Sequence, residues 1–289
     1  MTIVAAFATV HAPFIAGMPE LAPPEKREAV ARGFERLTQQ LDRVRAEVII
    51  TVSSEHITNF VGDETPGWCV SVGDTNPTQP EFGLPDRSVP GHPDLARALV
   101  DAAARTGFPL EARNQLRLDH GTNLPLSFVR PGYDIPVVPI LVNTVWAPFP
   151  SPSSADDLGT LLARFAAERD ERVVVMGTGG ISHWVGNRNH GSMNGDFDRH
   201  FVGLVMDGDR EALRSLSDAD IEPGGDGAHE IRTWITSAGA AAESGLAPEL
   251  VLAEPHVPGW NVGVYQIAWT SPEGQEAPEV EEEDRARAS

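Results

Sequence analysis

The stretch RVVVMGTGGISHW (residues 172–184) runs from β-branched residues through a glycine turn to a histidine, His183. A run that is apolar at nearly every position is typical of a strand in a parallel sheet with helices on both faces. Glycine turns after such strands also bind phosphate in nucleotide-binding proteins. The turn therefore either holds a phosphate or presents the imidazole of His183 at the end of a strand.

The spacing of the glycines argues against a phosphate site. A dinucleotide-binding turn needs the pattern G-x-G-x-x-G, and Gly177 and Gly179 fit it, but Ser182 stands at the third glycine position. The chain also lacks the Gly-Lys-Ser/Thr of a P-loop. We therefore expect the turn to position His183.

Strand and helix patterns alternate along the chain. Apolar runs predict strands over residues 2–10, 47–54, 135–143, 172–177 and 261–269. Between the first two strands, apolar residues recur four and three positions apart, which predicts a helix with one buried face. A second such pattern precedes the strand at 172–177. This alternation predicts an α/β fold, a single domain with a central, mostly parallel sheet flanked by helices.

We expect this domain to span residues 1–271. Residues 272–289 carry seven acidic and two basic side chains and one valine, too little apolar surface to order a segment, so they are predicted to form a disordered acidic tail. Residues 60–95 are rich in Gly, Pro, Asp and Thr and contain only one predicted short strand. A loop this long in a compact domain is either functional or disordered.

The composition excludes several classes of protein. A net charge of -20 argues against nucleic acid and anionic membrane surfaces as partners. No apolar run is long enough for a membrane span, and the N-terminus lacks the features of a secretory signal. The single cysteine, Cys69, allows neither an intrachain disulfide nor a cysteine-based zinc site, which fits a reducing cytoplasm. We expect a cytoplasmic protein.

Histidines follow three of the predicted strands. His11 follows the first, His56 the second and His183 the strand at 172–177. In open α/β sheets, ligands bind beyond the carboxyl ends of the strands. We therefore expect the three imidazoles to converge on an active site at that edge of the sheet.

A carboxylate can join them from the segment GGDGAHEIRTWITSAG (residues 224–239), which predicts a glycine turn entering a helix. At about 100° per residue, Glu230 lies roughly 90° from the centre of the buried stripe and can reach inward, whereas His229 is expected to face solvent. The alternative is that Glu230 is merely favoured by the helix dipole at an N-terminus.

Two imidazoles and one carboxylate form the facial triad of non-haem iron(II) oxygenases, and His11, His56 and Glu230 supply that set. Zinc accepts the same ligands, so residue types alone do not choose the metal. His120, expected in a polar turn before an apolar strand, and His183 are candidates for proton transfer, because imidazole titrates near neutral pH.

Five motifs, in this order, resemble one family: VHAPF, SSEHITNF, DHGTNLPL, GTGGISHW and GAHEIRTWI. They are similar to the class III extradiol ring-cleaving catechol dioxygenases, the LigB-like enzymes. The resemblance implies an iron(II) held by His11, His56 and Glu230, with His183 as base and His120 as proton donor. It also implies a small aromatic diol and O2 as substrates.

The resemblance leaves other points open. Some relatives carry a small helical subunit over the site; since this chain begins at its first strand, we expect that element to be absent, supplied separately or replaced by residues 60–95. We expect a homo-oligomer. Asn59 and Arg188 are candidate substrate contacts, and the choice among catechol, gallate and aminophenol substrates is open. The alternatives are a zinc hydrolase with the same ligands and a non-catalytic, Memo-like binding protein.

Overall fold

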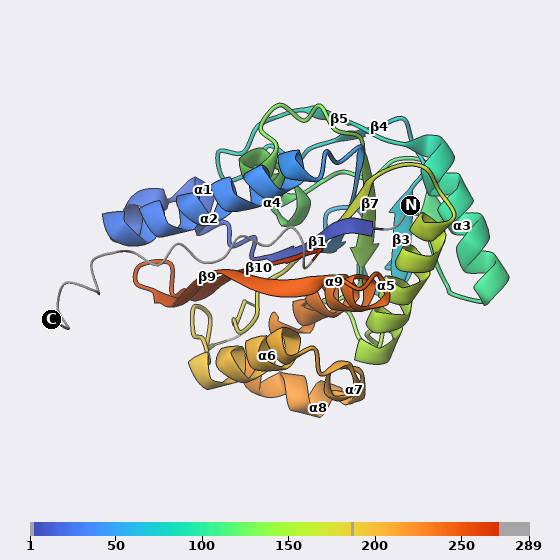
Figure 1. Cartoon of the computed structure of the whole chain (residues 1–289). Helices are drawn as coiled ribbons and strands as arrows, with labels where there is room; N and C mark the ends of the chain where they lie inside the picture. The colour runs from blue at the N-terminus through green and yellow to red at the C-terminus, as the bar shows by residue number, and fades with distance from the viewer. Residues whose placement is uncertain (1–2, 186–187, 272–289) are drawn as a thin grey trace, which may run out of the picture.

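The computed structural model describes residues 3–185 and 188–271 (Figure 1). The tail predicted for residues 272–289 lies outside this range. Eight strands form one sheet in the order β6-β3-β7-β2-β8-β1-β10-β9. Their bounds are β1 Ile3–Thr9, β2 Val48–Ser54, β3 Trp68–Ser71, β6 Glu111–Arg113, β7 Val137–Val142, β8 Val173–Thr178, β9 Ala247–Val257 and β10 Val262–Thr270.

The centre of the sheet is parallel. β2 pairs in parallel with β7 and β8, and β8 pairs in parallel with β1. On the flanks, β3 is antiparallel to β7 and parallel to β6, β10 is antiparallel to β1, and β9 is antiparallel to β10. The five predicted strands are confirmed as β1, β2, β7, β8 and β10. The predicted α/β class with a mostly parallel sheet is confirmed as well.

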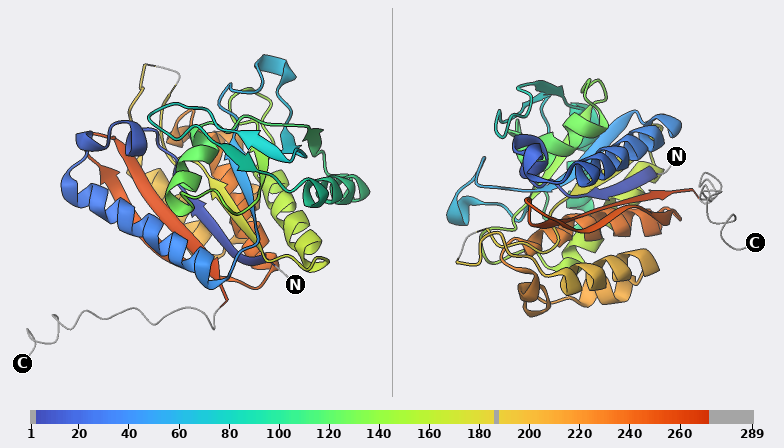
Figure 2. Two further views of the ribbon diagram at one scale, coloured as in Figure 1. Left: turned by 90° about the horizontal axis from the view of Figure 1, so that it is seen from above. Right: turned by 90° about the vertical axis from the view of Figure 1, so that its left-hand side faces the viewer.

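Helices cover both faces of this sheet (Figure 2). α2 and α4 pack together on one face, and α5 and α9 pack together on the other, on the side that also carries α6. Every residue of β2, β8 and β10 is buried as a result, which explains their continuous apolar runs. The helices are α1 Phe14–Gly17, α2 Pro24–Arg43, α3 Pro93–Thr106, α4 His120–Val129, α5 Pro152–Ala167, α6 Gly195–Asp207, α7 Arg210–Ser215, α8 Asp218–Ile221 and α9 Ile231–Glu243. Short 3-10 turns are η1 Pro19–Leu21, η2 Gly62–Glu64, η3 Glu222–Gly224 and η4 Ala228–Glu230. No helix among the described residues is both long and apolar enough to cross a bilayer.

Two regions differ from the sequence-based prediction. β9 was not predicted, because this edge strand buries only Val251 and Val257 fully and so has no apolar run. Residues 60–95 were predicted to hold one short strand, but they hold three. In addition to β3, β4 (Thr75–Pro77) pairs antiparallel with β5 (Ser88–Pro90), and the proline in each of these two strands disguised them.

The setting of His120 also corrects the prediction, because His120 begins helix α4 and does not precede a strand. The Asp119 carboxylate caps this helix by accepting the backbone N–H of Gly121 at 2.9 Å. Pro125 inside the helix cannot donate to the Gly121 carbonyl, which instead accepts the Thr178 hydroxyl at 2.6 Å. This bond ties the start of α4 to the end of β8.

Candidate active site

Three adjacent parallel strands place their histidines together. His11 follows β1, His56 follows β2, and His183 lies beyond the end of β8, which runs between those two strands. Glu230 stands at the N-terminus of α9, which packs on β1 and β8. The predicted convergence at the carboxyl edge of the sheet is therefore what the structure shows.

The Glu230 carboxylate contacts two of these imidazoles. Its Oε2 lies 3.0 Å from His11 Nε2, and its Oε1 lies 2.9 Å from His56 Nε2. Two ligand atoms about 2.1 Å from one metal ion and at right angles to each other are about 3.0 Å apart. The buried carboxylate and the two ring nitrogens therefore have the spacing of a metal-ligand set.

The Glu230 carboxylate is also bound to the glycine turn, because the backbone N–H of Gly180 donates to its Oε2 at 2.6 Å. Burial alone would raise the pKa of Glu230, but His11 and His183 outweigh it, so the pKa lies well below its ordinary value. The residue is thus an anion that faces the imidazoles. Its position is set by contacts with the imidazoles and with Gly180, and not by the helix dipole alone.

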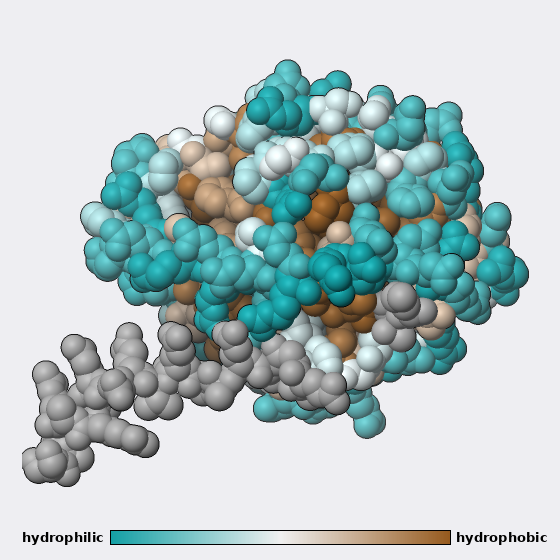
Figure 3. Space-filling view, turned by 45° about the horizontal axis from the view of Figure 1, so that its top comes forward, coloured by the Kyte–Doolittle hydropathy of each residue, from teal (hydrophilic) through white to brown (hydrophobic). Residues whose placement is uncertain are grey.

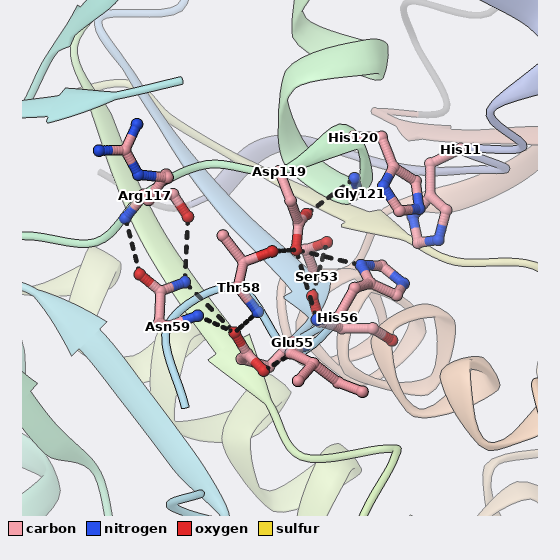
Figure 4. A network of polar contacts seen from close by, with 12 residues as sticks. His11, Ser53, Glu55, His56, Thr58, Asn59, Arg117, Asp119, His120 and Gly121 are labelled. Carbon is pink, nitrogen blue, oxygen red and sulfur yellow. Dashed lines mark hydrogen bonds and ion pairs between the residues drawn. The ribbon is translucent and has the colours of Figure 1, made fainter. Parts of the chain in front are cut away.

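Asp119 orients His56 from behind. Its Oδ2 lies 3.2 Å from His56 Nδ1, and it accepts the backbone N–H of His56 at 3.3 Å (Figure 4). Burial lowers the pKa of His56, but Asp119 and Glu230 outweigh it and hold the pKa well above its ordinary value. Burial likewise raises the pKa of Asp119, but His56 outweighs it and brings it to about 2. A carboxylate in this position fixes the tautomer and direction of a metal-binding imidazole.

A second carboxylate holds the loop that carries His56. Glu55, which is 2% exposed, accepts the backbone N–H groups of Ile57 at 2.7 Å, Thr58 at 2.8 Å and Asn59 at 2.5 Å. Figure 4 shows this cluster beside the imidazole of His56. Ile57 has a φ of 60°, a conformation that a β-branched residue adopts only when its surroundings enforce it. The Glu55 carboxylate holds Ile57 in this conformation by accepting its N–H and the N–H groups of the next two residues.

His120 has its own acidic partner, Glu81, from the long loop between β4 and β5. Glu81 Oε1 lies 2.8 Å from His120 Nδ1 and accepts the backbone N–H of His120 at 2.8 Å. The His120 ring stacks on His56 with centroids 4.4 Å apart. One ring nitrogen each of His11, His56 and His120 lies within 4.8 Å of the others, so these three imidazoles could also hold a metal ion.

His183 is enclosed by glycines. A Cβ on Gly180 would lie 2.5 Å from its Cε1, and a Cβ on Gly227 would lie 2.1 Å from its Nε2. Its Nε2 lies 3.8 Å from Glu230 Oε2. Burial outweighs the Glu230 charge and lowers the pKa of His183. The Nδ1 atoms of His183 and His11 are buried and have no hydrogen-bond partner among the described residues.

His229 corrects one prediction, because it is only 6% exposed and does not face solvent. Its Nδ1 lies 3.0 Å from Arg232 Nη1, and its ring lies 4.0 Å from that of Phe149. Burial and then Arg232 lower its pKa to about 4. The error arose because residues 228–230 form the 3-10 turn η4, so the angular phase of α9 cannot be extended back to His229.

A cavity of about 930 Å³ opens over these groups. Its polar lining includes His11, His56, His120, His183 and Glu230, and its aromatic lining comprises Phe14, Trp146, Trp184 and Trp260. On the outer surface, hydrophobic residues form patches among mainly hydrophilic ones (Figure 3). Trp184 lies in the stretch around His183 that was expected to line the site, whereas Trp146 and Trp260 were not predicted, because each lies in a separate loop or turn.

The two candidate substrate contacts lie outside this lining. The Asn59 side chain donates to the Arg117 carbonyl at 3.0 Å and accepts the Arg117 N–H at 2.8 Å, so its amide serves the loop (Figure 4). Arg188 is exposed. Substrate contact by either residue stays a prediction. Glu81 and Asp119 were not predicted to contact the histidines, since each lies far from its histidine partner in the chain and is brought to it only by folding.

The chain is similar to known proteins over most of its length. Residues 5–265 match the family model described as the catalytic LigB subunit of aromatic ring-opening dioxygenase. A 2,3-dihydroxyphenylpropionate/2,3-dihydroxicinnamic acid 1,2-dioxygenase of Burkholderia vietnamiensis is 27% identical, over 78% of this chain and 84% of the relative. One of the same name from Paraburkholderia phymatum is also 27% identical, over 84% of this chain and 88% of the relative.

Among solved structures, an uncharacterized protein of Escherichia coli K12 superposes with a TM-score of 0.59 at 16% identity. The match covers 92% of this chain and 99% of that one. At this identity the likeness concerns the fold alone. It confirms a single α/β domain.

Proposed function

Because this chain belongs to the family of catalytic LigB subunits of aromatic ring-opening dioxygenases, we propose that it is an extradiol dioxygenase that cleaves an aromatic diol with O2 and uses iron(II). One observation carries the proposal: the Glu230 carboxylate meets both His11 and His56 at the carboxyl ends of their strands, inside the cavity. The family match does not favour the zinc hydrolase or the Memo-like binding protein.

The donor set fits the proposed metal. His11, His56 and Glu230 would hold the iron as a facial triad that leaves positions open for other ligands. Asp119 directs His56 Nε2 toward Glu230, as the outer partner of a metal-binding histidine does. When bound, the iron would supply a Lewis-acidic, redox-active centre at which diol and O2 meet.

The other two histidines are assigned to proton transfer. His183 projects into the cavity near Glu230 from the glycine turn, so it can accept a proton from a substrate hydroxyl. The Nδ1 of His120 is engaged by Glu81, which leaves Nε2 to exchange a proton in the cavity.

The assembly is a further part of the proposal. A homo-oligomer, with or without a separate small helical subunit, is still a prediction from the sequence.

Anaerobic reconstitution with iron(II), followed by metal analysis and an oxygen electrode with a panel of catechols, tests the proposal. We expect about one iron per chain and O2 consumption with at least one catechol. Glu230→Ala should lose the iron, whereas His183→Phe and His120→Phe should keep it and lose turnover by about 10²- to 10⁴-fold. Iron binding without O2 uptake on any catechol, or hydrolysis with zinc, would overturn the assignment.

A further inference from the structure

We infer that the cavity selects aromatic diols whose substituent is bulky, apolar and uncharged over diols that carry a carboxylate. This inference rests on the proposed function and names the substrate class of the same site. The curated relatives described above are named for carboxylate-bearing substrates, so the cavity of this chain is expected to differ from theirs in charge preference.

The walls of the cavity are aromatic and come from separate parts of the chain. Trp146 follows β7, Trp184 follows the glycine turn, and Trp260 lies in the turn between β9 and β10. The Trp260 indole donates to the Met18 carbonyl at 3.1 Å, which fixes that ring against the segment between α1 and η1. Flat apolar walls of this kind bind rings and alkyl chains by burying their surface.

The mouth of the cavity is apolar too. Val145 and Val185 both line it, and they are 38% and 57% exposed. A substituent that extends from the diol toward the surface would cover these side chains. That contact favours a hydrocarbon, because a carboxylate placed against these two side chains gains no hydrogen bond from them.

Apart from the histidines, the ionisable side chains that line the cavity are acidic among the described residues. The described lining residues include the carboxylates of Asp226 and Glu230 but no lysine or arginine. Asp226 accepts the backbone N–H of Val185 at 2.8 Å, so its carboxylate is held at the same wall. Arg188 lies in the chain between the lining residues Val185 and His190, but it is exposed and outside the lining. Away from the histidines and the proposed metal position, a substrate carboxylate would therefore meet the charge of Asp226 and find no lysine or arginine in the described lining.

The size of the cavity agrees with a large substituent. Its volume of about 930 Å³ lies near the upper end of the roughly 300–1,000 Å³ range of pockets for drug-sized ligands. A single catechol ring would leave most of it empty. A second ring, as in 2,3-dihydroxybiphenyl, would lie among the tryptophans.

The test compares an acid with its uncharged methyl ester and with a larger, apolar diol. The probes are 2,3-dihydroxyphenylpropionate, its methyl ester and 2,3-dihydroxybiphenyl, used with the iron(II)-loaded enzyme in the oxygen electrode. Their binding is measured separately, without O2, by quenching of tryptophan fluorescence. We expect kcat/KM for the ester and the biphenyl to exceed that for the acid at least about tenfold. The difference should appear as a lower KM and a lower Kd for the two uncharged diols.

Two variants and a control assign the cause. Asp226→Asn keeps the acceptor for the Val185 N–H and should narrow the gap in kcat/KM between ester and acid. Asp207→Asn removes the same charge from the exposed end of α6 and should leave the gap unchanged. Arg188→Gln should also leave it unchanged. If Arg188→Gln instead weakened the acid alone, Arg188 would be its partner and the inference would be wrong.

The outcomes separate the inference from the proposed function. Equal or better binding and turnover of the acid would overturn the inference and leave the dioxygenase assignment intact. If no diol consumed O2 but the fluorescence titrations still ranked the ester above the acid, the proposed activity would fail and the charge preference of the cavity would stand.

Discussion

The most direct test of the role given to His183 is Gly227→Ala. Gly227 has φ -80° and ψ -18°, which alanine adopts freely, so the substitution causes no backbone strain. The new Cβ, however, would lie 2.1 Å from His183 Nε2, 2.4 Å from Cδ2 and 2.5 Å from Cε1. Ordinary contact begins at 3.4 Å, so the imidazole must move by more than about 1 Å.

That displacement should affect turnover far more than folding. The end of a side chain can rotate away at little cost, whereas a misplacement of about 1 Å costs a positioned catalytic group about 10²-fold in rate. We expect kcat/KM for O2 uptake to fall about 10²-fold, with the iron content and melting temperature close to those of the parent.

The control is Gly203→Ala in the middle of α6, where a Cβ meets nothing within 4 Å. It should leave turnover unchanged and raise the free energy of unfolding by about 0.5–1 kcal/mol, because glycine weakens a helix interior. A Gly227→Ala enzyme with parental turnover would refute the placement of His183 as the base.

Three further predictions concern carboxylates. Asp119→Ala should weaken iron binding about 10- to 100-fold, measured by competition with a chelator, and should cost about 1 kcal/mol through the lost cap of α4. Glu81→Ala should lower turnover about tenfold or more at unchanged iron content, whereas Glu81→Gln, which can still accept from His120, should restore most of it. Burial raises the pKa of Asp198 from 3.8 to about 6, so the folded protein binds this proton more tightly and loses stability as the pH rises between those values. Asp198→Asn can still accept the Ser182 N–H, so it should stabilise the fold at pH 7 by up to about 3 kcal/mol and have no effect below pH 4. The measurement is a series of denaturation curves across this pH range. Stability differences that do not vary with pH would contradict the raised pKa of Asp198.

The sequence predicted the centre of the molecule well because its signals are local. Continuous apolar runs mark strands that are covered on both faces, and the residues that follow such strands must meet at one edge of the sheet. His11, His56 and His183 were placed by this rule. Glu230 was expected from the helical period, but it lies in the 3-10 turn η4, where that period does not hold, so its inward position did not follow strictly from the pattern. Each of these inferences needs only a few neighbouring residues.

The missed features depend on contacts between distant segments. Glu81 reaches His120 across 39 positions, and Asp119 reaches His56 across 63. No local pattern marks such a pair. The predicted setting of His120 was wrong because Pro125 argues against a helix in this segment. The helix forms nevertheless, since the Thr178 hydroxyl donates to the Gly121 carbonyl, to which Pro125 cannot donate.

The division of the cavity between two kinds of structure has a consequence for engineering. The histidines and Glu230 stand at the ends of central strands and at the start of a helix, where any change disturbs the core. The four aromatic side chains, Phe14, Trp146, Trp184 and Trp260, stand on peripheral segments. A mutant library confined to these four positions would therefore vary the accepted ring system and leave the catalytic apparatus intact, which makes this chain a suitable starting point for directed evolution toward new aromatic substrates.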